Sequence, residues 1–190
     1  KSSLNGEHAQ WFKDLLKNKD LELIKEYVKQ NNCSMVFEVI DIENDPHIIK
    51  YDKSDIVLLD VIDNSIEFKK LPYEELQEVV AKFNFTVKEK AITLNSTQEF
   101  WDWYYEVTQE EYKYKNAYVE GFVVEDSNGF TVKVKLDYYN QWKFMRSILG
   151  EVIKQGYINK TSKLTTKFHN DFYNWCKTNR DRLPENIITA

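Results

Sequence analysis

The sequence has few of the residues that disulfide-linked or metal-holding proteins need. Its two cysteines, Cys33 and Cys176, lie far apart and form no Cys-x-x-Cys pair. A disulfide framework or a zinc site is therefore not expected, and a reducing cytoplasm is the predicted location. The histidines His8, His47 and His169 are scattered without the spacing of a ligand set, so surface or turn positions are expected for them.

Long hydrophobic runs and an excess of positive charge are also missing. No apolar run approaches the roughly 20 residues that a membrane span needs, and no signal-peptide pattern is present, so no membrane association is predicted. The net charge of −5 excludes a basic coat for nucleic acid. Binding to nucleic acid would need local basic sites instead.

The chain does have enough apolar residues for a sizeable core, since 42% of its 190 residues are hydrophobic. Its hydrophobic periodicity predicts both kinds of regular structure. The expected helices cover residues 6–30 in two pieces, 72–83, 96–114, 138–156 and 163–183, and the expected strands 34–42, 47–51, 55–62 and 85–90, with a hairpin in 118–139. Short strands joined by turns favour an antiparallel sheet, so the fold class is α+β.

The segment 118–139 predicts a hairpin, because Asn128-Gly129 suits its tight turn. Strand alternation places the residues on two faces. The expected core face carries Val119, Gly121, Val123, Val132, Val134 and Leu136, and the expected opposite face carries Glu120, Phe122, Val124, Lys133 and Lys135.

The charged side chains of this hairpin have two interpretations. In the first interpretation they form a solvated face, in which Glu120 pairs across the strands with Lys135. Alternatively they form a site, in which two cations neutralise phosphate oxygens and the carboxylate holds a divalent ion or a water. Gly121 favours the second, because a glycine inside a strand often marks the close approach of a ligand or another backbone.

Glu38 interrupts the apolar strand segment 34–42 in a similar way. Alternation places Val36, Glu38 and Ile40 on one face, which predicts either an exposed edge or a half-buried site. An ionised Glu38 can accept hydrogen bonds from a ribose hydroxyl.

Taken in order, these segments resemble the covalent nucleotidyltransferases, and most closely the ATP-dependent RNA ligases of the T-even phage tRNA-repair type. Phe37-Glu38 and the strands after it resemble motifs III and IIIa, "EGFVV" (120–124) resembles motif IV, and "KVK" (133–135) resembles motif V. Tyr139 matches an aromatic at the nucleotide site, and Lys1 matches a lysine that approaches the nucleotide phosphates. The resemblance covers most of residues 1–140.

The resemblance implies a partial antiparallel-sheet, ATP-grasp-like nucleotidyltransferase core over residues 1–140 and a helical C-terminal appendage over 141–190. It also implies three steps: a lysine takes AMP from ATP, AMP moves to a 5′-phosphate RNA end, and a 3′-hydroxyl then displaces AMP. ATP and Mg²⁺ (or Mn²⁺) are the implied cofactors, and RNA, with cleaved tRNA as one candidate, is the implied partner in RNA repair.

The resemblance also implies roles for single residues. Glu120, Lys133 and Lys135 are the implied catalytic residues, with Glu120 as metal ligand. The implied nucleotide-binding residues are Phe37, Glu38, Lys1, Phe122 and Tyr139.

The sequence departs from the family in one respect. The family's nucleophile lies in a Lys-x-[Asp/Asn]-Gly motif, and no lysine here has that context. We therefore expect a C-terminal portion of a ligase that does not adenylate itself and that works with the N-terminal part of the same protein. The alternative is a non-catalytic, ligase-like module that binds nucleotide or RNA.

Two helical segments leave further alternatives open. The aromatic residues in 100–114 fit a core helix better than a base-stacking surface, although both are possible. Lys143 and Arg146 give the next helix a basic side. A solvated face is the simpler interpretation of that side, and contact with a phosphate backbone is the other.

Overall fold

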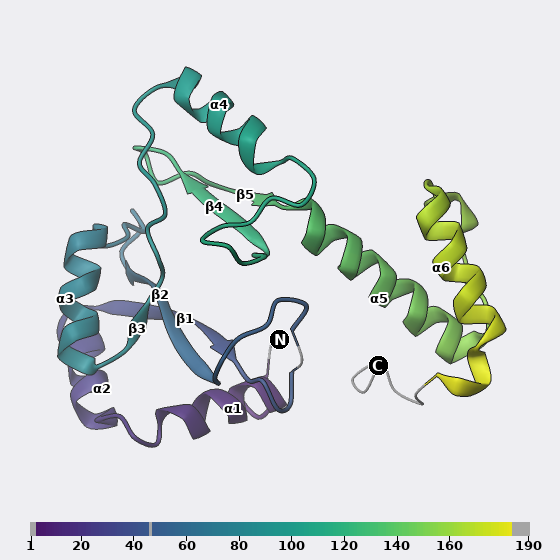
Figure 1. Cartoon of the computed structure of the whole chain (residues 1–190). Coiled ribbons are helices and arrows are strands. Elements are labelled where there is room, and N and C mark those ends of the chain that lie inside the picture. The colour runs from purple at the N-terminus through teal and green to yellow at the C-terminus, as the bar shows by residue number, and fades with distance from the viewer. Residues whose placement is uncertain (1–2, 46, 184–190) are drawn as a thin grey trace. The chain divides into compact units, whose positions relative to one another are not determined.

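The computed structural model describes residues 3–45 and 47–183 and shows an α+β chain (Figure 1). Its elements divide between two compact units. The first unit covers the chain up to residue 93 together with residues 125–131, and the second covers residues 94–124 and those from 132 onwards. Each unit is described by itself.

The first unit is built on a three-stranded sheet with helices packed against it (Figure 1). Its elements are α1 (Glu7–Leu16), α2 (Leu21–Gln30), β1 (Cys33–Ile40), β2 (Asp55–Asp63), α3 (Tyr73–Phe83) and β3 (Thr86–Val87). β1 and β2 pair in antiparallel fashion, as predicted, but β3 joins β2 in parallel. The expectation of a purely antiparallel sheet is therefore wrong at this edge.

The connection between β1 and β2 also differs from the prediction. Residues 47–51 form bends and irregular structure instead of a strand. The connection opens with a turn held by Asp41, whose carboxylate accepts hydrogen bonds from the backbone N–H groups of Glu43 and Asn44. Since β1 pairs directly with β2, the apolar residues Ile48 and Ile49 contribute no strand between them.

The core of the first unit lies between the sheet and its helices. Its buried residues are Cys33, Ile56, Leu58, Val61, Leu76, Val79, Phe83 and Phe85. Alternate residues of β1, namely Met35, Phe37 and Val39, pack against this core from the strand. The residues between them, Val36 and Glu38, are exposed on the other side, as the period of two predicts.

The second unit combines a hairpin stem with three helices (Figure 1). Its elements are α4 (Thr97–Val107), β4 (Gly121–Glu125), β5 (Thr131–Lys135), α5 (Asp137–Gln155), α6 (Lys167–Thr178) and the short 3₁₀ turns Thr161–Lys163 and Arg180–Arg182. The tip of the hairpin, residues 125–131, groups with the first unit. At that tip Asp126 accepts hydrogen bonds from the backbone N–H groups of Asn128 and Phe130, which explains the turn.

Helix α4 begins where its sequence predicts and ends earlier. Ser96 accepts a hydrogen bond from the N–H of Glu99, and Glu99 accepts one from the N–H of Asn95, as in a capping box. The helix ends at Val107, seven residues before the predicted end at residue 114. Left-handed backbone at Glu111, with φ of 62°, is incompatible with a continuing α-helix.

Two small cores hold the second unit. Val107, Val134 and Leu136 are buried where α4 meets the hairpin, with Trp103, Tyr112, Val119, Phe122 and Val124 around them. Ile148, Val152, Ile158 and Cys176 form the other core, where α5 packs against α6. α5 ends at Gly156, whose φ of 86° is the left-handed conformation that closes many helices.

Candidate functional site

The hairpin stem has two faces, and the structure assigns them differently from the sequence. The N–H of Leu136 donates to the carbonyl oxygen of Glu120 over 3.1 Å, which places these residues opposite each other. Phe122 then lies opposite Val134, and Val123 lies opposite Lys133. The predicted assignment of residues to the two faces is therefore wrong for one strand, because a register shift of one residue turns one strand over relative to the other.

The corrected register explains the burial of most of the hairpin residues. Phe122 and Val124 pack in the same core as Val134 and Leu136. Val123, which we expected in the core, lies on the opposite face and is 62% exposed. Val132, also expected in the core, shares the face of Val134 but is 46% exposed near the tip of the hairpin, and the register does not explain this.

Gly121 lies where the two strands of the stem come closest. Its φ is +151°, which residues with a side chain rarely adopt. A Cβ atom there would overlap the carbonyl oxygen of Val134 and lie 3.0 Å from the Cα of Lys135. The close approach that the sequence suggested is thus made by the backbone of the partner strand.

Glu120 and Lys135 form an ion pair at the end of the stem. Their side chains are 39% and 33% exposed, respectively, so solvent screens the pair and its contribution to stability is small. The cross-strand pair that we considered from the sequence is therefore present.

Tyr139, in the first turn of α5, receives two cations. The Nζ atom of Lys135 lies 4.9 Å from the centre of the Tyr139 ring, and that of Lys143 lies 5.6 Å from it. Lys133 is exposed two residues before Lys135 on the same strand. One carboxylate, three ammonium groups and an aromatic ring therefore belong to the end of the hairpin and the start of α5.

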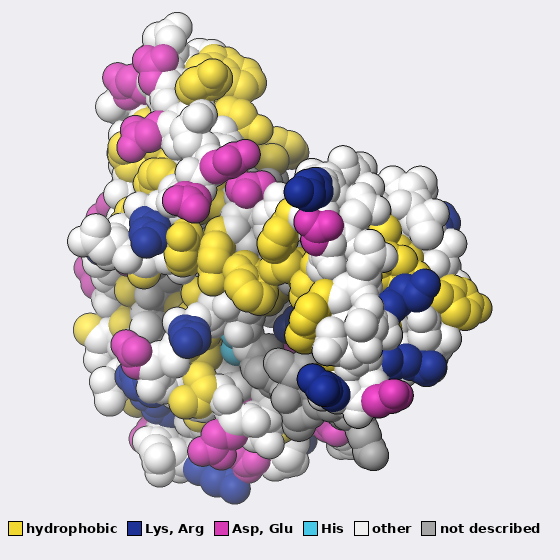
Figure 2. Space-filling view, turned by 45° about the vertical axis from the view of Figure 1, so that its right-hand side comes forward, with side chains coloured by type: hydrophobic (Ala, Val, Ile, Leu, Met, Phe, Trp, Pro, Cys, Tyr) yellow, Lys and Arg dark blue, Asp and Glu magenta, His cyan; other side chains and the backbone are white. Residues whose placement is uncertain are grey.

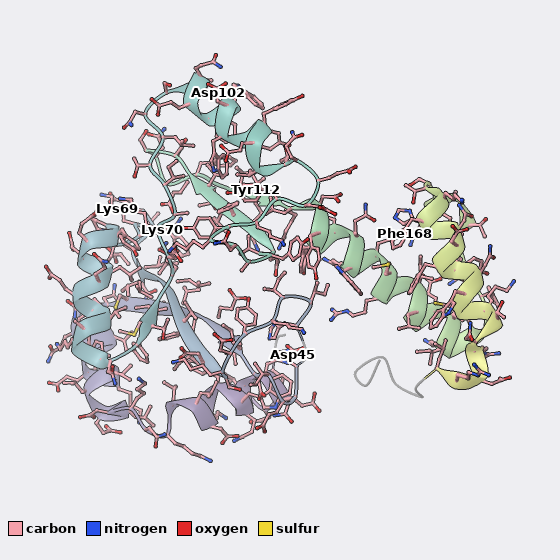
Figure 3. All side chains as sticks on the ribbon, in the orientation of Figure 1. Asp45, Lys69, Lys70, Asp102, Tyr112 and Phe168 are labelled. Carbon is pink, nitrogen blue, oxygen red and sulfur yellow. The ribbon has the colours of Figure 1, made fainter. Side chains whose placement is uncertain are left out.

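Phe122 is positioned by packing. Its ring contacts those of Trp103, Tyr112 and Tyr114 at centroid distances of 5.3, 6.4 and 5.6 Å. Figure 3 shows Tyr112 beside the hairpin. This aromatic cluster gives Phe122 a structural role, and its role in nucleotide binding stays a prediction.

In the first unit, Phe37 and Glu38 point to opposite faces of β1. Phe37 stacks edge-on against Phe85 at 4.9 Å and belongs to the core side, whereas Glu38 is exposed. The structure therefore leaves Glu38 accessible to a ligand. Lys1 lies outside the described residues.

A hollow of about 460 Å³ lies beside Phe37, and nothing in the sequence pointed to it. Its lining comes from α1, the residues before α1, and the core side of β1: Ser3, Gly6, His8, Ala9, Phe12, Met35, Phe37 and Val39. His8 at its edge pairs with Asp45 over 3.3 Å. The alternation of β1 was visible in the sequence, but the distance between α1 and the strand was not.

A magnesium ion would need ligands from outside the protein as well as from it. In residues 3–45 and 47–183, no three His, Cys, Asp or Glu side chains come together as a metal site. Mg²⁺ is commonly held by one or two carboxylates together with substrate phosphates and waters. Glu120 is a carboxylate of that kind, so a phosphate-bearing substrate would have to complete the site.

None of the helices in the described residues is long and apolar enough to cross a membrane.

The visible surface in Figure 2 mixes acidic, basic and hydrophobic side chains, without a broad field of one charge. Because the whole chain has a net charge of −5, recognition of a polyanion would depend on local groups such as those at the hairpin.

The sequence was compared with models of known protein families. A family model described as RNA ligase, of the T4 type, matches residues 1–139. No curated protein matches the chain. The matched region includes β1, the hairpin and the first residues of α5.

Proposed function

Since the chain belongs to the T4-type RNA ligase family, we propose that it carries the ATP- and RNA-binding groups of a ligase that joins 5′-phosphate and 3′-hydroxyl RNA ends. The observation that carries this proposal is the arrangement at the hairpin end, where the Glu120–Lys135 pair lies next to Tyr139 and on the same strand as Lys133. These charged groups lie at the base of the hairpin, away from its turn, and their side chains are partly open to solvent.

Lys133 and Lys135 act on the phosphates in this proposal. Transfer of a nucleotidyl group concentrates negative charge on phosphate oxygens, and fixed cations lower the barrier by stabilising that charge. Glu120 holds Lys135 in position before ATP arrives, and it supplies the carboxylate that Mg²⁺ requires. Magnesium would add further charge neutralisation at the phosphates.

Each unit also contributes one residue to the proposal: Tyr139 of the second unit is assigned to a base, and Glu38 of the first unit is assigned to ribose hydroxyls. The Tyr139 ring lies near the ammonium groups of Lys135 and Lys143 and is the aromatic ring assigned to the base. Glu38 is an exposed acceptor for ribose hydroxyls. The nucleotidyltransferase core and its cytoplasmic location are parts of the same proposal.

The chain contains no Lys-x-[Asp/Asn]-Gly sequence, so we propose that it does not form the lysyl-AMP by itself. The sealing step has no such requirement. In that step the 3′-hydroxyl attacks the adenylylated 5′-phosphate, a phosphodiester bond forms, the bond to AMP breaks, and the hydroxyl proton goes to solvent.

Two assays test the proposal on the chain as it stands. Calorimetric titration with ATP and Mg²⁺ measures nucleotide binding, and incubation with 5′-adenylylated RNA and a 3′-hydroxyl acceptor measures sealing. We expect both to succeed, and we expect α-labelled ATP to leave no acid-stable label on the protein.

The outcomes separate the alternatives. ATP binding without sealing would identify the non-catalytic binding module. Failure to bind ATP would refute the assignment of the hairpin groups. A covalent label on the protein would refute the proposal that the chain does not form the lysyl-AMP by itself.

A further inference from the structure

A second group of aromatic and basic residues lies around the loop before β4 and the start of α5. The rings of Tyr118 and Tyr138 stack in parallel, with centroids 3.7 Å apart and an interplanar angle of 5°. Lys113 lies 4.7 Å from the centre of the Tyr118 ring. This stack fixes the loop to the first turn of α5 and makes a preformed surface of flat rings.

Helix α5 extends this surface along one face. Trp142 and Lys143 follow Tyr139 by three and four residues and precede Arg146 by four and three, the spacings that bring side chains to one side of a helix. Trp142 is 48% exposed, although it packs at 6.1 Å from Tyr138.

We propose that this surface, formed by Lys113, Tyr118, Tyr138, Trp142, Lys143 and Arg146, binds single-stranded RNA. Trp142, the exposed ring beside the Tyr118–Tyr138 stack, accepts a base by stacking, and the cations lie on the same surface for the phosphates. From Tyr139 to Arg146 the helix spans about 10 Å, which suits a short stretch of strand. The choice of RNA as occupant rests on the proposed function, and the surface adds the path of the substrate strand next to Tyr139.

The charges favour a polyanion over a basic partner. The basic residues Lys143 and Arg146 give this side of α5 two positive charges, to which Lys113 adds a third beside the acidic Glu110 and Glu111 of its loop. The two acidic residues of α5 already accept hydrogen bonds, Asp137 from Gln141 and Glu151 from the backbone N–H of Asn159. An acidic peptide shares this attraction to cations, but it offers no flat rings for Trp142. Stacking therefore distinguishes the two ligands.

The test uses a fluorescein-labelled single-stranded RNA of about twelve nucleotides, long enough for the sites that such surfaces cover. Fluorescence anisotropy without ATP measures its affinity for the unmodified chain and its variants. We expect Trp142→Ala to weaken binding roughly tenfold, as loss of one stacked base predicts, and Trp142→Phe to keep most of it. We expect Lys143→Ala to weaken binding and to reduce its dependence on salt.

Helix α6 provides matched controls in the same unit. Trp175 is 54% exposed, and Lys177 lies 5.4 Å from the Tyr173 ring, much as Lys143 lies from Tyr139. Trp175→Ala and Lys177→Ala should bind the RNA like the unmodified chain. Equal affinities for Trp142→Ala and Trp175→Ala would overturn the proposal.

Competition identifies the ligand. Single-stranded RNA should displace the probe, whereas an equal concentration of duplex RNA or of polyglutamate should do so poorly. Displacement by polyglutamate would make the surface a site for acidic proteins and would overturn the proposal, as would equal displacement by duplex. ATP binding by Trp142→Ala is measured separately. If this variant binds ATP normally, a failed RNA-binding test refutes the RNA surface and leaves the proposed function intact.

Discussion

The two units use their strands in different ways, although both place charged residues on an open strand face. In the first unit, the long strands β1 and β2 lie against helices, and eight buried residues form one core behind them. In the second unit, the strands of the hairpin have five residues each, and only three buried residues support them. The charged groups of the hairpin therefore depend on close backbone packing and on the aromatic cluster of Phe122 more than on a large core.

The largest expected effect is on the rate of the reaction, to which the hairpin of the second unit contributes its cations. Lys133→Ala should lower the rate of sealing of 5′-adenylylated RNA by about 10²- to 10³-fold, because it removes one cation from the charge that develops on phosphate. The fold should be unchanged, since Lys133 is exposed. Lys163→Ala, an exposed lysine in a 3₁₀ turn, is the control and should seal at the normal rate; an equal loss there would refute the role of Lys133.

The second largest expected effect is on stability, where truncation of a core residue should destabilise mainly the unit that contains it. Leu76 is fully buried in the large core, and Leu136 is 2% exposed in the small one. Each change to Ala should cost about 2–5 kcal/mol of unfolding free energy, because it leaves a cavity. Native-state hydrogen exchange should show Leu76→Ala lowering protection in the first unit and Leu136→Ala in the second. Loss of protection throughout the chain in both variants would show that the units unfold together.

The close approach at Gly121 gives a smaller effect. Gly121→Ala should lower the unfolding free energy by roughly 2–3 kcal/mol, because the backbone must leave its strained conformation and move away from Val134. Gly129, in the hairpin turn, has φ of 82° but open space around it, so Gly129→Ala should cost less. Urea unfolding compares the two, and equal costs would mean that the packing at Gly121 is unimportant.

The smallest effect concerns the turn after β1. The side-chain hydrogen bond from Asn44 is the largest influence on Asp41 and lowers the pKa of its carboxyl, with further bonds from the backbone of Asn44 and Glu43. The carboxylate therefore stabilises the fold at neutral pH, and this contribution is lost as pH falls below about 4 and through the lowered pKa. Asp41→Ala should cost about 1 kcal/mol at pH 7 and less in acid.

Asp41→Asn provides the control for this turn. It keeps an oxygen that accepts the two backbone hydrogen bonds but cannot titrate. Its stability, followed by urea unfolding from pH 7 to pH 3, should depend less on pH than that of the unmodified chain. Identical pH profiles would exclude Asp41 as a source of acid sensitivity.

Much of the candidate site follows from local sequence. Asn128-Gly129 specifies the turn of the hairpin, and the alternation of Lys133 and Lys135 with valines specifies a strand with one charged face. The pairing of Glu120 with Lys135 was also accessible as one of two interpretations. What local sequence could not supply is the partner of each face, since Phe122 and Val123 are equally apolar and only α4 decides which of them is buried.

The sequence by itself determined where most helices and strands begin, because capping residues, turn residues and hydrophobic periods act over a few neighbours. It also determined the family, through the order of short motifs along the chain. Only the tertiary structure decided the register of the hairpin, the parallel pairing of β3 and the stacking of Tyr118 on Tyr138. These features depend on contacts between distant residues, and a shift of one residue in a strand leaves its local pattern unchanged while reversing which face meets the core.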